Sequence, residues 1–222
     1  MAATVTRWWW IRHAPATGHG GRVYGQEDYP ADLSDIATFA ALAALLPADS
    51  VWVTSHLQRT RDTAAAILAA SAHTGAPVCL IEPDIAEQHV GGWHGLTYEE
   101  LNTIRGVEQD AFALWPASER APDGESFLDV MARVGQVVAR LTAAHRGHDI
   151  VAVGHGGSIR AALAIALGTE AERVMSFAID NCSLTRLDHI SDGQDAGRER
   201  ACWRIVAVNL PPRHARPHSK SA

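Results

Sequence analysis

Short, continuous apolar runs recur along the chain, and each is followed by a turn or a polar loop. Such runs are typical of strands that are buried on both faces of a sheet. The run Trp8-Trp9-Trp10-Ile11 is the bulkiest of them and leads directly into Arg12 and His13. The expected strands cover residues 7–12, 51–54, 78–81, 149–153 and 201–208, with two further candidates at 176–179 and 183–187.

Between these runs, apolar residues recur three and four positions apart, as they do on one face of a helix. The spacing predicts helices from Asp32 or Ser34 to about Leu46, from the segment after Ser55 to a point before Gly75, from Thr97 onward, from Ser126 to about His145, and from Ser158 to Leu167. Thr97 and Glu100 form a capping-box pattern, which marks the first turn of a helix.

Alternating strands and helices indicate an α/β fold. We expect a three-layer sandwich with a mostly parallel central sheet, an antiparallel edge formed by the last strands, and helices on both faces. A turn is expected at 191–197. We expect residues 1–6 to be a short frayed segment before the first strand. Residues 1–210 are expected to form a single domain, and residues 211–222 to be a disordered tail.

Composition excludes several classes of function. The chain of 222 residues is 47% hydrophobic and 20% charged and has a net charge of −6, which gives no basic footprint for nucleic acid. We expect no membrane span and no signal peptide. Three cysteines without metal-like or redox spacing favour free thiols in the cytoplasm. An edge strand and the tryptophan cluster leave a homodimer possible.

Polar groups follow three of the expected strands at the point where each strand ends. They are Arg12-His13, the segment from Ser55 to Arg59, and Gly154-His155-Gly156. Parallel strands direct their carboxyl ends to one edge of a sheet, where ligands bind. Arginines match phosphate oxygens, and glycines at a helix start let backbone N–H groups approach an anion. The set therefore predicts a phosphoryl site, with His13 as its nucleophile.

These motifs together resemble the histidine phosphatase superfamily, whose fold is that of phosphoglycerate mutase. The resemblance rests on Arg12-His13, on the pattern Ser55-x-Leu57-x-Arg59, on Glu87 before Gly91-Gly92-Trp93, on Gly124-Glu125-Ser126, and on Gly154-His155-Gly156-Gly157. The pattern is most similar to small α-ribazole and broad-specificity phosphatases. It departs from the family where Ala14 and Pro15 replace the usual glycine and acidic residue.

The resemblance implies a metal-independent phosphomonoesterase that needs no cofactor and acts on a small phosphorylated metabolite, for which α-ribazole phosphate is a candidate. His13 would form a phosphohistidine, and Arg12, Arg59 and His155 would hold the phosphoryl oxygens. Glu87 would protonate the leaving group and then activate water. The expected substrate-binding residues are Gly156, His19, Tyr24 and Gln26.

Three other functions remain open on the sequence alone. A phosphoglycerate-type mutase would use the same residues but would protect its phosphohistidine from water. A phosphate-binding protein without catalysis would keep the pocket, although such decayed sites commonly lose the nucleophile. A metallohydrolase built on the histidines is disfavoured because they lack close pairs with a carboxylate at helical spacing.

Overall fold

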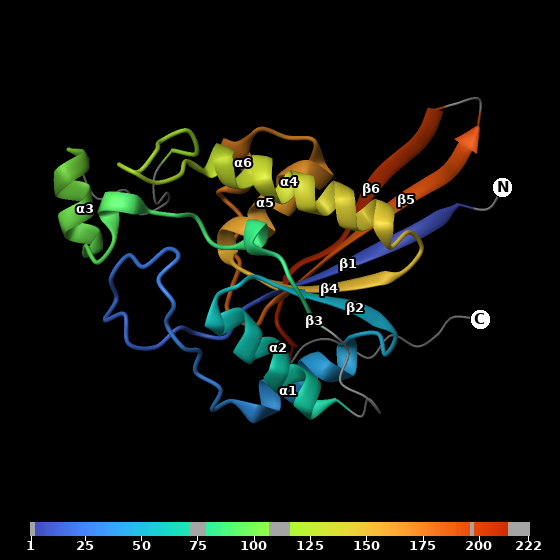
Figure 1. The fold of residues 1–222 in the computed structure, drawn as a ribbon, viewed down its shortest axis with the longest axis horizontal. Coiled ribbons are helices and arrows are strands. Elements are labelled where there is room, and N and C mark those ends of the chain that lie inside the picture. Colours follow the sequence, from blue (N-terminus) through green and yellow to red (C-terminus); the bar gives the residue numbers. More distant parts are fainter. Residues whose placement is uncertain (1–2, 72–78, 107–115, 196–197, 213–222) are drawn as a thin grey trace.

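The structure is a computed structural model that describes residues 3–71, 79–106, 116–195 and 198–212. A central sheet of six strands has the order β3-β2-β4-β1-β5-β6 (Figure 1). The strands are β1 (Thr4–Arg12), β2 (Ser50–Thr54), β3 (Cys79–Ile81), β4 (Asp149–Gly154), β5 (Leu184–Asp195) and β6 (Arg198–Leu210). The first four strands in this order are parallel, and β5 and β6 add an antiparallel edge. This is the predicted mixed sheet.

Helices cover both faces of the sheet, as the alternating pattern predicts (Figure 1). The helices are α1 (Ile36–Leu45), α2 (Gln58–Ala70), α3 (Tyr98–Arg105), α4 (Phe127–Ala144), α5 (Gly156–Leu167) and α6 (Ala171–Val174). Two 3₁₀ turns, η1 (Pro83–Ile85) and η2 (Gly91–Trp93), lie in the polar loop between β3 and α3. Within the described ranges, no helix is long and apolar enough to cross a membrane.

The tryptophan run anchors β1 on both faces of the sheet. Trp8 and Trp10 belong to the core beneath α4 and α5, and their rings stack with centroids 5.2 Å apart. Trp9 and Ile11 belong to the opposite core, which α1 and α2 cover. Alternation along a strand sends successive side chains to opposite faces, so a continuous apolar run is what a central strand requires. The strand that leads into His13 is therefore fixed from both sides.

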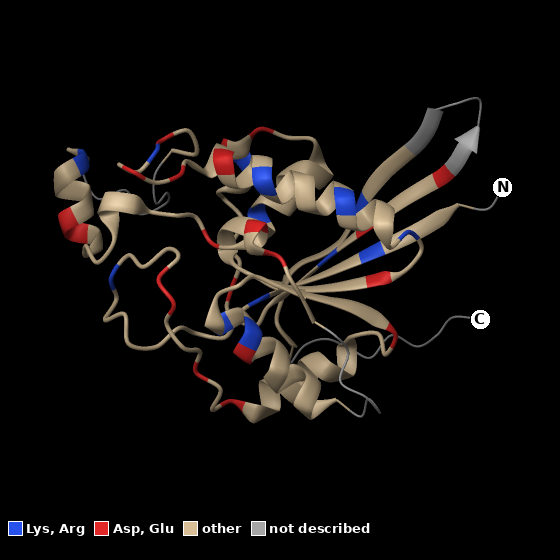
Figure 2. Cartoon of the chain, in the orientation of Figure 1, with Lys and Arg blue, Asp and Glu red and all other residues tan. Residues whose placement is uncertain are grey.

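The ends of β1, β2 and β4 meet at one edge of the sheet. In the parallel register, Arg12 pairs with Gly154, and Thr54 pairs with Val153. The three polar segments that follow these strands therefore leave the sheet side by side. Figure 2 shows that charged residues lie mostly on helices and loops, while the central strands carry few.

Several predicted boundaries are wrong. Residues 176–179 form no strand, because Phe177 closes a turn on Val174 and offers its carbonyl oxygen to Arg160. The first strand begins at Thr4, and β5 continues through Ser191 to Asp195, so these segments are neither a frayed lead-in nor a turn. Residues 196–197, Val78, and most of the expected tail (213–222) lie outside the described residues.

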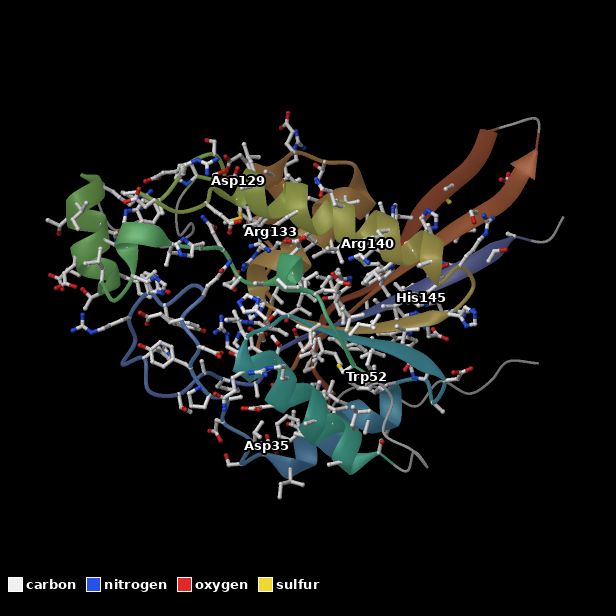
Figure 3. All side chains as sticks on the ribbon, in the orientation of Figure 1. Asp35, Trp52, Asp129, Arg133, Arg140 and His145 are labelled. Atoms are coloured by element: carbon white, nitrogen blue, oxygen red, sulfur yellow. The ribbon has the colours of Figure 1, made fainter. Side chains whose placement is uncertain are left out.

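Helix caps follow the predicted chemistry with one correction. Asp35, labelled in Figure 3 at the start of α1, accepts the backbone N–H of Thr38 and caps this helix. The predicted caps Asp32 and Ser34 instead bond to each other, through the Ser34 N–H and the Asp32 carboxylate. Thr97 and Ser126 cap α3 and α4 with capping boxes, as polar side chains do for exposed N–H groups.

Candidate active site

His13 is buried at the end of β1, with about 1% of its surface exposed. Its backbone N–H donates to Gly154, and its carbonyl oxygen accepts from Asn181 Nδ2 at 2.8 Å. Its ring Nδ1 lies 2.7 Å from the carbonyl oxygen of Ala14. A carbonyl oxygen only accepts, so Nδ1 carries the proton and Nε2 keeps its lone pair. The tautomer is therefore the one that a nucleophilic Nε2 requires.

The pKa of His13 is lowered to about 3, mainly by burial and then by the positive charges of Arg59 and Arg12. The hydrogen bond to Ala14 acts in the opposite direction and is outweighed. His13 is thus neutral at physiological pH. A neutral imidazole is the reactive form for attack on phosphorus.

His155 lies beside His13 at the junction of β4 and α5, with the ring centroids 5.0 Å apart. Its Nε2 is 2.8 Å from the hydroxyl of Ser55, which follows β2. The pKa of His155 is well below its usual value because of complete burial, with His13 and the two arginines adding to the effect. Two neutral imidazoles therefore lie together at the edge of the sheet, as the motif spacing predicts.

Arg12 and Arg59 bring two positive charges to these histidines. Arg59 is fully buried; its Nη atoms donate to the carbonyl oxygens of Gly25 and Glu27, and its guanidinium lies over the ring of Tyr24. Arg12 donates through Nη1 to the carbonyl of Ile179. Neither arginine makes an ion pair in the described residues. Their charges are therefore available to an anion.

Three buried side-chain nitrogens of this cluster have no hydrogen-bond partner in the described part of the chain. They are Nε of Arg12, Nε of Arg59 and Nδ1 of His155, and they account for three of the seven buried side-chain nitrogen and oxygen atoms that have no partner there. A buried donor without an acceptor costs about 1–3 kcal/mol, so native proteins rarely leave one unsatisfied. An anion with several acceptor oxygens would satisfy all three groups.

Glu87 reaches the start of α5 from the loop that follows η1. Its Oε1 accepts the backbone N–H of Gly157 at 3.0 Å and that of Gln88 at 3.1 Å. A side chain at Gly157 would displace this carboxylate, so glycine leaves room for it. The carboxylate is therefore held at the start of α5, where it borders the same space beside Gly156 as Nε of Arg12.

A cavity of about 210 Å³ opens over this edge of the sheet. Arg12, Glu87 and Gly156 line it, while His13, Arg59 and His155 are buried outside its lining. The remaining wall is largely apolar or aromatic and includes Val23, Tyr24, Val90, Tyr98, Phe127 and Met175. A polar inner end with an apolar wall suits a ligand whose anionic group enters first.

The expected substrate-binding residues occupy three different places. Gly156 and Tyr24 line the cavity. Gln26 lies behind it and donates through Nε2 to the backbone carbonyl of Glu87 at 2.8 Å. His19 packs against Tyr24 with ring centroids 4.6 Å apart and is outside the lining. Gln26 and His19 thus contact residues of the site rather than the cavity itself.

Two arginines of the site are absent from the sequence predictions. Arg133, labelled on α4 in Figure 3, donates to the backbone carbonyls of Asp84, Ala86 and Glu87, and so fixes the loop that carries Glu87. Arg160 lines the cavity from α5. Its position four residues after Gly156 places both on one helix face, a signal that the sequence did contain. No local pattern marks Arg133.

The described residues contain no group of three or more His, Cys, Asp or Glu side chains placed to hold a metal ion. The donors around His13 are nitrogens of arginine and neutral histidine. Arginine carries no lone pair for a metal, and its charge repels cations. The donor set therefore fits an anion.

The sequence profile of the histidine phosphatase superfamily (branch 1) matches residues 8–199. The chain belongs to this superfamily, as the order of its motifs indicates. It is 34% identical over 172 residues to the glucosyl-3-phosphoglycerate phosphatase of Mycolicibacterium vanbaalenii, with 71% of this chain and 72% of that protein covered. It is also 31% identical over 146 residues to the bifunctional protein Rv2228c of Mycobacterium tuberculosis, but spans only 39% of that protein's length against 66% of its own.

Solved structures show the same fold. The mycobacterial glucosyl-3-phosphoglycerate phosphatase Rv2419c superposes with a TM-score of 0.76 at 26% identity, covering 94% of this chain and 100% of that one. A putative α-ribazole-5′-P phosphatase from Escherichia coli superposes with a TM-score of 0.72 at 21% identity, covering 93% and 97%. The second likeness concerns the fold alone.

Proposed function

We propose that this protein is a metal-independent phosphomonoesterase that acts on a small phosphorylated metabolite through a phosphohistidine. One observation carries the proposal: a neutral His13 with a free Nε2 lies among three buried side-chain nitrogens that have no hydrogen-bond partner in the described residues. Membership in the histidine phosphatase superfamily and the names of the matched phosphatases support the same activity.

In the first step, Nε2 of His13 attacks phosphorus in line, forming an N–P bond as the ester P–O bond breaks. The N–H groups of Arg12, Arg59 and His155 hold the equatorial oxygens, where negative charge must be stabilised. The carboxyl group of Glu87 gives its proton to the departing alkoxide. The alcohol then leaves through the cavity.

In the second step, water attacks the phosphohistidine and gives a proton to the Glu87 carboxylate. The N–P bond breaks, inorganic phosphate leaves, and His13 returns to its neutral form. The Ala14 carbonyl keeps the proton on Nδ1 during both steps, because it offers an acceptor at 2.7 Å. Glu87 thus ends the cycle protonated, as it began.

The deciding experiment is to trap the intermediate. Wild-type protein mixed with p-nitrophenyl phosphate and quenched in base should gain one phosphoryl group by intact-mass analysis, and the label should be lost in acid and map to His13. His13→Ala should neither gain the label nor release phosphate above background, and its circular dichroism spectrum should match that of wild type. Turnover without any label, or a label on another residue, would overturn the proposal.

Two further measurements define the reaction class. Turnover should persist after dialysis against a chelator, and loss of activity there would favour the metallohydrolase. Inorganic phosphate should accumulate one for one with the alcohol, whereas a mutase would return the phosphoryl group to the substrate. α-Ribazole phosphate and glucosyl-3-phosphoglycerate are the first substrates to test, the former from the motif resemblance and the latter from the relatives' names.

A further inference from the structure

Arg160 is part of the cavity wall but has no role in the reaction described above. It lies on α5, four residues after Gly156, and its Nε donates to the carbonyl oxygen of Phe177 at 2.9 Å. This bond fixes the plane of the guanidinium. The two terminal nitrogens make no hydrogen bond or ion pair within the described chain. They border the cavity instead.

Four other arginines that are not exposed each pair with a carboxylate. Arg105 pairs with Glu119 at 2.6 Å, Arg133 with Glu125 at 2.8 Å, Arg186 with Asp188 at 3.0 Å, and Arg7 with Asp149 at 3.8 Å. Among the arginines of the described residues that are not exposed, Arg12, Arg59 and Arg160 lack such a partner. A partly desolvated charge without a counter-charge is costly, which points to a ligand that supplies one.

Glu87 is a nearby negative charge, but it does not pair with Arg160 directly. Its carboxylate accepts from the backbone N–H groups of Gly157 and Gln88 and forms no ion pair with Arg160. Burial lowers the pKa of Arg160, while the charge of Glu87 opposes this change and that of Arg12 adds to it. Arginine stays protonated even so. Arg160 therefore keeps a positive charge beside the cavity that no ion pair within the described residues neutralises.

The space beside Gly156 shows how close the guanidinium of Arg160 lies to the proposed phosphoryl site. A methyl group placed on Gly156 would be 3.2 Å from Nη1 of Arg160, and 3.9 Å from both Nε of Arg12 and Oε2 of Glu87. The guanidinium of Arg160, the unpartnered Nε of Arg12 and the candidate acid thus border the same small space. A ligand bridging the two arginines needs only a few bonds between its anionic groups.

We propose that Arg160 binds a carboxylate on the leaving-group side of the substrate, so that the preferred substrates are short phosphorylated hydroxy acids. This inference rests on the proposed phosphatase function and concerns the same cavity. Arginine presents two parallel N–H donors that match a carboxylate. One carboxylate charge balances one guanidinium, whereas a second phosphate dianion would add unbalanced charge beside Glu87. α-Ribazole phosphate, which carries no carboxylate, fits this subsite poorly.

The test compares substrates that differ only in this group. Wild-type protein is assayed for phosphate release from 3-phosphoglycerate, from glycerol 3-phosphate and from p-nitrophenyl phosphate as a reference. We expect kcat/KM for 3-phosphoglycerate to exceed that for glycerol 3-phosphate by about 10- to 100-fold, the effect of a charged hydrogen-bonded pair. Hydrolysis of the reference substrate without this preference overturns the inference alone, and no hydrolysis at all overturns the proposed function.

Arg160 variants identify the source of the preference. Arg160→Gln should lower kcat/KM for 3-phosphoglycerate at least tenfold more than that for glycerol 3-phosphate, and Arg160→Lys should keep part of the preference. Arg173, an exposed arginine on the neighbouring α6, provides the matched control, and Arg173→Gln should leave both values unchanged. Equal losses on both substrates in Arg160→Gln would contradict the subsite. If the variants do not fold, the wild-type comparison still decides.

Discussion

The hydroxyl oxygen of Ser55 lies 2.8 Å from Nε2 of His155, while Nδ1 on the other side of that ring is buried without a partner in the described residues. For Nδ1 to donate to a phosphoryl oxygen, the neutral ring must carry its proton there, and Nε2 must accept. Thr60 bonds to the Leu57 carbonyl and to Ser55 and so fixes the hydroxyl in place. We infer that the Ser55 hydroxyl donates to Nε2, which makes Ser55 a positioning residue that sets the tautomer of His155.

Replacement of this hydroxyl should weaken catalysis through the histidine. Ser55→Ala should lower kcat/KM by about 10- to 100-fold, because a buried ring nitrogen loses its partner and the tautomer is no longer fixed. Ser55→Thr keeps the hydroxyl and should recover part of the loss. The ¹⁵N chemical shifts of His155 report the tautomer directly.

An exposed serine serves as the control. Ser176→Ala, at the surface after α6, should change neither the rate nor the ¹⁵N shifts. If Ser55→Ala keeps the His155 tautomer and the wild-type rate, the positioning role is wrong, whatever happens to stability.

The low pKa of His13 predicts that stability decreases in mild acid. The folded state titrates near pH 3, whereas an unfolded histidine titrates near pH 6.5. Between these values only the unfolded chain binds the proton, so the free energy of unfolding falls as pH decreases from about 6.5. The contribution of one such group is about 1.4 kcal/mol per pH unit. His155 acts in the same direction.

Urea unfolding at pH 7, 6 and 5 measures this effect. The stability difference between wild type and His13→Gln should shift by about 1.4 kcal/mol in favour of the variant between pH 6 and pH 5. Parallel pH curves for the two proteins would mean that His13 titrates normally and is not buried as described.

Glu87 should matter most when the leaving group is a poor one. Glu87→Gln keeps the shape and an oxygen for the N–H groups of Gly157 and Gln88, but it has no proton to give. We expect kcat/KM for an alkyl phosphate to fall by about 10²- to 10⁴-fold and that for p-nitrophenyl phosphate to fall much less, since p-nitrophenolate leaves without help. Glu99→Gln on the exposed face of α3 is the control. Equal losses for both leaving groups would remove Glu87 as the proton donor.

Much of the fold follows from local patterns, since buried strands need continuous apolar runs and helix starts need capping side chains. The failures occur where distant contacts decide. The sequence of residues 176–179 is typical of a strand, but the segment forms a turn in which the Phe177 carbonyl oxygen accepts a hydrogen bond from Arg160. The start of α1 offers three capping side chains in succession, Asp32, Ser34 and Asp35, and only the packing of the preceding loop selects Asp35.

The candidate site also divides into features that local patterns predict and features that depend on distant contacts. Positions at strand ends bring Arg12, His13 and His155 together, because parallel strands fix where their ends lie. The sequence does not reveal that both Nη atoms of Arg59 hold the loop at Gly25 and Glu27, because that depends on how an irregular segment folds. The orphaned Nε of Arg59, which supports anion binding, follows from this folding.

Phosphate and vanadate should both stabilise the protein, because either supplies acceptors to the buried N–H groups of Arg12, Arg59 and His155. A ligand at 100 times its Kd adds about 2.7 kcal/mol to the free energy of unfolding, which appears as a higher Tm. Chloride at equal ionic strength is the control for general salt effects. Arg59→Lys should lose the shift, since one ammonium cannot both hold the loop carbonyls and reach the anion.

The increase in Tm caused by vanadate should exceed that caused by phosphate only while Nε2 of His13 is present to bond to the vanadium atom. His13→Ala should therefore reduce the vanadate shift to the phosphate value. Equal shifts for the two anions in wild type would show that His13 does not face the bound anion.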